Sequence, residues 1–179
     1  AGGYVSMSNL INTSGVVASD VSGVGTVRNH MGASTYGTGL AIFAYGATTG
    51  TSMISISNKV SNVGVIAADV GSLAGTARWG LAAANYGTDK VIFGYGFSSG
   101  YLSMTNLASN TGVVAADVTG VGTALTELSA AKYGSSGQAL FCYGEFSSAE
   151  FKNTRNLVSN TGVVASTVSG AGTARRLAA

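Results

Sequence analysis

The sequence predicts an all-β protein made of tandem repeats of about 50 residues, each forming four short strands. Three observations support this fold class. Sequence anchors recur in the same order along the chain, short runs of β-branched and aromatic residues are bounded by Gly and Ser, and 27 glycines with no proline supply the turns. This arrangement is typical of a β-propeller, or of a partial propeller with about 3.5 blades.

The anchors define the repeat. A Gly-Thr pair opens each copy, at Gly25, Gly75, Gly122 and Gly172. A Tyr-Gly pair follows, then a Phe-x-Tyr-Gly segment, and then an Asn that precedes a glycine turn. We expect the aromatic anchors to hold the structure of each repeat; they are Tyr36, Phe43, Tyr45, Tyr86, Phe93, Tyr95, Tyr133, Phe141 and Tyr143.

The repeats fill a single domain, residues 1–179. Residues 25–74, 75–121 and 122–171 are full copies, residues 1–24 match the last two strands of a copy, and residues 172–179 begin another first strand. Because the partial copies at the two ends lack a second strand, we expect open strand edges and self-association into a homo-oligomer. In the clearest copy the expected strands are Thr76–Asn85, Lys90–Gly96, Tyr101–Leu107 and Gly112–Asp117.

The composition excludes several classes of function. Charged residues make up only 9% of the chain, the net charge is +2, and no basic cluster exceeds Arg175 and Arg176. Nucleic-acid binding needs a concentrated basic surface, so it is not expected. No apolar run approaches the ~20 residues of a membrane-spanning helix, so membrane insertion is not expected either. The only cysteine, Cys142, excludes a disulfide within the chain and is expected to be a small buried residue.

The polar character of the chain bears on its location. With so few charges, the surface is expected to consist mainly of Ser, Thr, Asn and Gly. Such surfaces are common on secreted or particle-borne β proteins. We therefore expect a virion or extracellular location.

Residues 78–112 resemble known repeats. The Arg-x-Gly-Leu-Ala-Ala-Ala-x-Tyr-Gly segment, the following Asp-Lys-Val-Ile-Phe-Gly-Tyr-Gly and the Asn-Thr-Gly turn resemble a kelch-type propeller blade. Where kelch blades have paired glycines, this chain has Gly94, Tyr95 and Gly96. Over nearly its whole length, the chain also resembles the Gly- and Tyr-rich tandem repeats of bacteriophage virion proteins, including tail-fibre and tail-associated proteins. That resemblance implies a structural or host-attachment role and includes no catalytic motif.

Two polar positions recur from copy to copy. One position holds Asp20, Asp69, Asp117 and Thr167, and the other holds Arg28, Arg78, Leu125 and Arg175. The Asp side chains are expected to form hydrogen bonds to local backbone N–H groups at a turn rather than to bind a metal. The Arg side chains are expected to bond carbonyl groups between blades, with ligand binding as the alternative.

Residues that break the repeat are better candidates for function, because the fold does not require them in every copy. Trp79 is the only tryptophan; exposed, it would stack on a sugar ring, and buried, it would fill space between blades. His30 is the only histidine, but no Gly-x-Ser-x-Gly elbow accompanies it to suggest a catalytic triad. The candidate ligand-binding residues are therefore Trp79, Arg28 and His30. No catalytic residue, metal ligand or cofactor is predicted.

A group of charged residues lies in the third copy, at Glu145, Glu150, Lys152 and Arg155. Paired carboxylates can hydrolyse glycosidic bonds, which makes Glu145 and Glu150 a possible catalytic pair. The two neighbouring cations favour instead a solvated and locally neutral face.

The sequence therefore predicts a non-enzymatic structural protein of a phage virion or another extracellular assembly, associated with a tail or fibre and with host attachment. Its expected partners are further copies, other proteins of the assembly, and a host-surface glycan. One alternative is a lectin-like propeller with a shallow sugar site in each repeat. Two others are a self-assembling extracellular filament subunit and a glycan-degrading enzyme.

Overall fold

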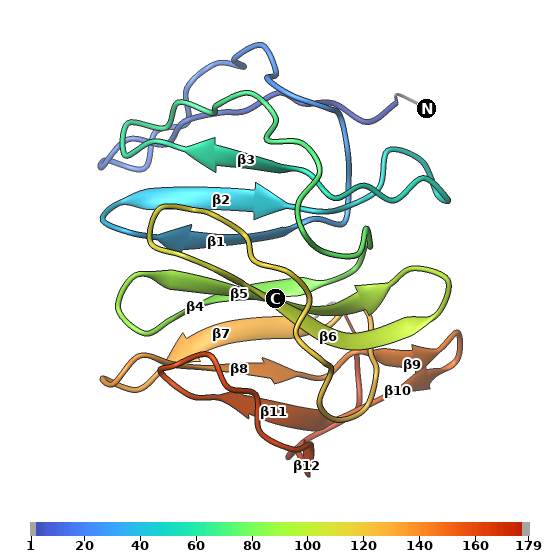
Figure 1. Ribbon diagram of the computed structural model, residues 1–179. Coiled ribbons are helices and arrows are strands. Elements are labelled where there is room, and N and C mark those ends of the chain that lie inside the picture. Colours follow the sequence, from blue (N-terminus) through green and yellow to red (C-terminus); the bar gives the residue numbers. More distant parts are fainter. Residues whose placement is uncertain (1–2, 177–179) are drawn as a thin grey trace.

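The computed structural model describes residues 3–176, and every regular element in this part of the chain is a β-strand (Figure 1). The strands form small antiparallel sheets, none of which closes on itself. The first two repeats contain β1 (Gly32–Tyr36), β2 (Leu40–Ala44), β3 (Ser57–Val60), β4 (Ala82–Tyr86), β5 (Lys90–Phe97) and β6 (Tyr101–Ala108). The third contains β7 (Ser129–Tyr133), β8 (Gln138–Cys142), β9 (Glu145–Ser147), β10 (Glu150–Phe151), β11 (Thr154–Val158) and β12 (Val168–Ser169).

Each repeat folds as an antiparallel meander, with strand order β1-β2-β3, β4-β5-β6 and β7-β8-β11. In the second repeat, Ala83 lies opposite Phe93, and Phe93 lies opposite Asn106. The third sheet gains β12 beyond β11, and β9 and β10 form a separate hairpin. The repeats thus share one topology, and Figure 1 shows the three sheets following one another through the molecule.

Successive sheets meet through their first strands, because β1 contacts β4 and β4 contacts β7. Backbone hydrogen bonds join equivalent positions across these contacts. The N–H of Gly80 donates to His30 O at 3.0 Å, and the N–H of Glu127 donates to Gly80 O at 2.7 Å. The sheets are therefore stacked in phase. A second series runs from Gly46 N to Arg78 O, from Gly96 N to Leu125 O and from Gly144 N to Arg175 O.

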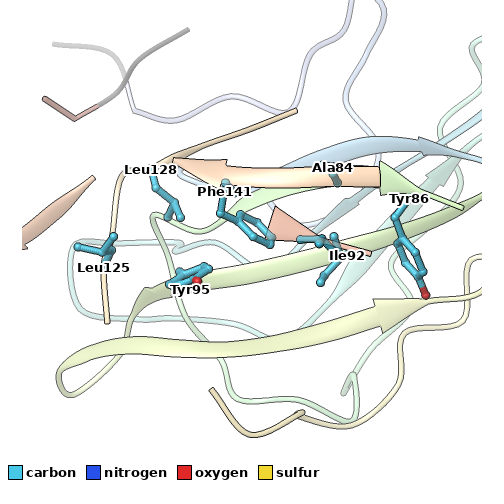
Figure 2. Packing of buried hydrophobic residues seen from close by; sticks show 10 residues of the cluster. Ala84, Tyr86, Ile92, Tyr95, Leu125, Leu128 and Phe141 are labelled. Carbon is cyan, nitrogen blue, oxygen red and sulfur yellow. The ribbon is translucent and has the colours of Figure 1, made fainter. Parts of the chain in front are cut away.

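The Tyr of each Phe-x-Tyr-Gly segment packs against the next repeat. The Tyr45 ring meets the edge of Phe93, with ring centroids 5.9 Å apart, and the Arg78 guanidinium lies 4.2 Å from the Tyr45 ring centre. Tyr95 meets Phe141 in the same way at 5.1 Å, and Figure 2 shows these two rings together in the core. Aromatic contacts thus tie each repeat to the one that follows it.

Whether an aromatic anchor is buried depends on its neighbouring repeat. Tyr36 and Tyr86 are each 3% exposed. They are covered by the turns at Gly112 and Gly162, which belong to the following repeat in each case. Tyr133 of the third repeat is 38% exposed. Phe43 and Tyr143 are half-buried, and the remaining anchors, Tyr45, Phe93, Tyr95 and Phe141, are buried.

Two expectations about the strands were wrong. In the second repeat, the first strand begins at Ala82 rather than Thr76, because Gly80 adopts a positive φ of 65° that interrupts the extended chain. The strand expected at Gly112–Asp117 forms only isolated bridges. There the N–H of Val113 donates to the Ser109 hydroxyl, and this turn competes with strand pairing. Among the described residues, only the third repeat forms a four-stranded sheet.

Candidate functional site

The recurring Arg and Asp belong to one network within a repeat. In the second repeat, Arg78 is fully buried and donates from Nη2 to Asn106 Oδ1 at 2.7 Å. Asn106 Nδ2 donates to Asp117 Oδ1 at 2.9 Å, and the backbone N–H and hydroxyl of Thr76 donate to Asp117 Oδ2. The expected local turn bond was therefore wrong, since Thr76 lies 41 residues from Asp117. Arg78 also donates to the carbonyls of Thr76 and Tyr95, both in its own repeat rather than in a neighbouring one.

Arg28 occupies the same network in the first repeat. Its side chain is buried and donates to Asn58 Oδ1 at 2.6 Å and to Thr26 O at 3.1 Å. Asn58 and Thr26 both donate to Asp69, as their counterparts do in the second repeat. Arg28 therefore has well-defined partners inside the repeat, and the pocket that it lines is a different one from that of His30 and Trp79.

The third repeat replaces both charged members of the network. Leu125 stands at the Arg position and Thr167 at the Asp position. Asn156 Nδ2 donates to Thr167 Oγ1 at 3.0 Å, and Thr123 N–H donates to the same oxygen at 3.1 Å. Because the cation and the anion are both absent, no charge is left buried without a partner. A buried charge without a partner would be strongly destabilising.

The Gly-Thr anchor follows from the same network. A Cβ at Gly75 would lie 2.5 Å from Asn106 Nδ2 and 2.6 Å from Tyr45 Oη. A Cβ at Gly25 would lie 2.5 Å from Asp69 Oδ1. Only glycine allows the backbone to approach these side chains so closely.

The residues that break the repeat gather next to the starts of the first strands. We call His30, Trp79, Glu127, Glu145 and Arg176 the end cluster. The ring centroids of His30 and Trp79 are 5.2 Å apart, and His30 Nε2 lies 4.0 Å from Glu127 Oε1. Arg176 Nη1 lies 3.0 Å from Glu127 Oε2 and also bonds Glu145. The cluster thus combines an aromatic surface with an imidazole, two carboxylates and a guanidinium.

His30 and Glu127 are held in an unusual backbone conformation. They occupy the same repeat position as Gly80, and all three residues have positive φ, at 50°, 51° and 65°. Residues other than glycine rarely adopt a positive φ, and this backbone conformation costs on the order of 1 kcal/mol or more. The central Gly80 carries no side chain, so the imidazole of the first repeat and the carboxylate of the third repeat approach each other. Strained residues of this kind often occur at binding sites.

Opposite charges organise the other side of the end cluster. Glu145 is buried, and its carboxylate accepts bonds from Arg176 and from the Tyr101 hydroxyl. The bond to Glu145 and the nearby charge of Glu127 raise the pKa of Arg176. Burial and the Glu145 carboxylate raise the pKa of Tyr101, so its hydroxyl remains a hydrogen-bond donor at neutral pH. These polar side chains therefore bond to one another beside the aromatic residues of the end cluster.

A pocket of about 300 Å³ opens at the end cluster. Its lining includes Tyr4, Asn29, His30, Trp79 and Glu127. Trp79 is half-buried, so it both packs against Phe97 and contributes part of its ring to the pocket. Among the described residues, no side chain or backbone group donates a hydrogen bond to the buried Asn29 Oδ1. The pocket therefore offers an aromatic face together with polar groups at its edge.

The expected neutral, solvated face in the third repeat was only half right. Glu150 is exposed and pairs with Lys152, as expected for a solvated face. Glu145 is 6% exposed and is held by Arg176 and Tyr101. A positively charged side chain therefore lies against each carboxylate, Arg176 at Glu145 and Lys152 at Glu150.

Residues 3–176 contain no group of three or more His, Cys, Asp or Glu side chains placed to hold a metal ion. Within the same residues, no helix has the length and apolar character needed to cross a lipid bilayer. Comparison with known proteins gave no matching family model and no matching curated sequence.

Sequence reasoning singled out His30 and Trp79 but missed Glu127 and Arg176. The signal was present in the repeat alignment, since His30, Gly80 and Glu127 share one position and Trp79 and Arg176 share the position just before it. Residues that break the repeat at the same position lie next to one another when repeats stack in phase. Treating each of them singly concealed that they form one group.

Proposed function

We propose that this protein is a non-enzymatic building block of an extracellular or virion assembly, associated with a tail or fibre and with host attachment. The observation that supports this role is that the junctions between repeats share the same backbone hydrogen bond. Gly46, Gly96 and Gly144 each donate a backbone hydrogen bond to the same position of the following unit, at Arg78, Leu125 and Arg175. The junction at Arg175 thus repeats the two junctions before it.

We further propose that the repeats are blades of a β-propeller or partial propeller. The first strands β1, β4 and β7 contact one another in sequence, as inner strands do around a propeller axis. Each sheet then extends outward through its second and third strands. A complete ring would need further blades of the same kind beside these three.

The mass of the protein in solution tests this role. Light scattering after size exclusion, with negative-stain images of the same fraction, should show a defined oligomer or a fibre. A closed ring would favour the propeller assembly, and an extended fibre would favour a filament subunit. A compact monomer of 17.7 kDa at all concentrations would contradict the building-block role.

A specific observation favours sugar binding as a second function. The end cluster places Trp79 beside His30 and Glu127 at a pocket, and aromatic faces with nearby hydrogen-bonding groups suit sugar rings. These residues are not repeated, so the geometry favours one site for the chain rather than one site per repeat. A host-surface glycan is the proposed ligand.

Glycan binding measured on an array, followed by calorimetry with the best ligand, tests the second function. The Trp79→Ala variant should bind at least about tenfold more weakly, which corresponds to about 1.4 kcal/mol. Tyr133→Ala, at an aromatic residue that is 38% exposed and outside the pocket, is the matched control and should bind normally. Equal binding by the two variants would exclude Trp79 from the site.

A further inference from the structure

A second pocket, of about 190 Å³, lies between the N-terminal segment and the first repeat. Its lining includes Met7, Val24, Arg28, Met31 and Phe43. The residues at the equivalent positions of the later repeats surround the tyrosines of the Phe-x-Tyr-Gly segments. We propose that this pocket is a binding socket for a tyrosine carried on a Phe-x-Tyr-Gly strand of another repeat unit of this type. The inference rests on the assembly role proposed above and names the chemistry of the partner.

The occupied junctions show what the socket accepts. At the first of them, Tyr45 lies between Arg78 and Phe93, with the guanidinium 4.2 Å from its ring centre. At the second, Tyr95 packs against Phe141, and its hydroxyl donates to Val121 O at 3.3 Å. Both junctions therefore pack the tyrosine ring against the Phe of the following repeat. Only the first adds a guanidinium, and only the second adds a hydroxyl bond, because the Tyr45 hydroxyl has no partner among the described residues.

The third junction repeats these contacts near the C-terminus. Arg175 lies 3.7 Å from the centre of the Tyr143 ring, and the Tyr143 hydroxyl donates to Ala171 O at 3.3 Å. At the open pocket, the corresponding groups are the Arg28 guanidinium, the Phe43 ring and the Val24 carbonyl. These groups offer a cation for the face of a ring, an aromatic side chain for its edge and an acceptor for its hydroxyl.

Exposed apolar residues on the N-terminal segment provide independent support. Ile11 is 67% exposed, whereas Ala108 at the equivalent position is 1% exposed and is covered by its pairing with β5. Val17 is 58% exposed, whereas its counterpart Val114 is 7% exposed. A second strand that carried the tyrosine would cover Ile11 by pairing along this edge, as strand addition does in other complexes. Val114 packs with Tyr36 of the preceding repeat, so a further unit would cover Val17.

The polar network of this segment is also half-formed. Asn9 Nδ2 donates to Asp20 Oδ1 at 2.8 Å and to Ala18 O at 3.0 Å, which reproduces the bonds of Asn58 and Asn106. In the first two repeats, an Arg and a Thr that precede the first strand complete the network. Asp20 is exposed here and retains an oxygen to accept those donors. The segment therefore matches a repeat unit in charge as well as in shape.

A synthetic peptide with the β5 sequence, extended by terminal lysines for solubility, tests the proposal with the whole protein. Calorimetry or fluorescence titration should show saturable binding of one peptide per chain. Replacing the peptide tyrosine that corresponds to Tyr95 by alanine should weaken binding by about tenfold or more. Equal binding of the two peptides, or no binding of either, would overturn the socket.

Variants of the protein locate the binding. Met7 is 51% exposed and lines the pocket, so Met7→Trp should fill the pocket and abolish peptide binding without unfolding the chain. Val63→Trp, at a residue that is 69% exposed and outside the pocket, should leave binding unchanged. Loss of binding in both variants, or in neither, would contradict the proposed location.

The two proposals fail separately. Peptide binding by a protein that stays monomeric would retain the socket and remove the building-block role. Self-association without peptide binding would retain the building-block role and remove the socket. Displacement of the peptide by a free sugar would assign the pocket to small ligands and would also overturn the proposal.

Discussion

At the scale of single residues, the structure explains how a buried charged side chain is accommodated. Arg78 is fully buried, yet its guanidinium has partners at Tyr95, Thr76 and Asn106. Burial lowers the pKa of Arg78, while Tyr45 and Asp117 oppose that change. A buried cation of this kind is tolerated because its hydrogen-bonding groups meet acceptors.

Aromatic packing gives the first prediction. Phe93 is completely buried between β4 and β6 and touches Tyr45 of the preceding repeat. Phe93→Ala should lower the free energy of unfolding by about 3–5 kcal/mol, because it removes apolar contacts and leaves a cavity. Phe146→Ala, at a residue that is 41% exposed, is the control and should cost much less. Similar denaturation midpoints for the two variants would show that Phe93 is not part of the core.

The Asp117 carboxylate gives a prediction about pH. Burial alone would raise its pKa, but hydrogen bonds from Thr76 and Asn106 and the charge of Arg78 outweigh burial and lower it. Ionised Asp117 therefore stabilises the fold above the unfolded-state pKa of about 3.9, and this stabilisation is lost as the pH falls through the lower folded-state value.

The third repeat supplies the design of the experiment on pH. The double variant Arg78→Leu with Asp117→Thr copies the Leu125 and Thr167 arrangement, which contains no titrating group. Its melting temperature should fall less steeply than that of the wild type as the pH is lowered from 5 to 2. An unchanged slope would mean that Asp117 does not contribute to acid unfolding.

At the scale of elements, the second and third strands of a repeat were predictable, whereas the first began later than expected and the fourth formed only isolated bridges. The β5 region was placed almost correctly, because Val91, Ile92 and Phe93 form a β-branched and aromatic run between polar residues. The shortness of β4 was missed, because the positive φ of Gly80 depends on a hydrogen bond to the neighbouring repeat. Contacts between repeats do not follow from the properties of one strand.

The joint replacement at Leu125 and Thr167 predicts an energetic coupling. Leu125→Arg alone should cost about 3–5 kcal/mol, because it buries a cation without its counter-ion. Adding Thr167→Asp should recover much of that loss by rebuilding the network of the second repeat. A double-mutant cycle from urea denaturation measures the coupling. Additive effects would mean that the two positions act independently.

At the scale of the whole molecule, all-β architecture and tandem repetition followed from composition and period, whereas the end cluster did not. His30, Trp79 and Arg176 come from different copies and meet only because the sheets stack in phase. Sequence reasoning identified two unusual residues, but it did not show which residues of different copies lie close together in space. The repeat position that His30 shares with Gly80 and Glu127 could have indicated this proximity.

Because tyrosines cross every junction, the repeats should unfold together rather than one at a time. Strong coupling between neighbours makes an array cooperative. Trp79 is the only tryptophan and lies between the first and second repeats, so its fluorescence reports on one junction. Its urea transition should coincide with the transition in far-ultraviolet circular dichroism. Separate midpoints would show that the junctions are weak.

The tyrosine contacts also bear on how the length of such an array can change. Tyr45 meets an Arg and a Phe at its junction, while Tyr95 meets a Leu and a Phe. Losing or duplicating one unit in phase would place Tyr45 against Leu125 or Tyr95 against Arg78, and both pairings are chemically suitable. Genetic recombination between units can therefore lengthen or shorten the array without creating an incompatible joint.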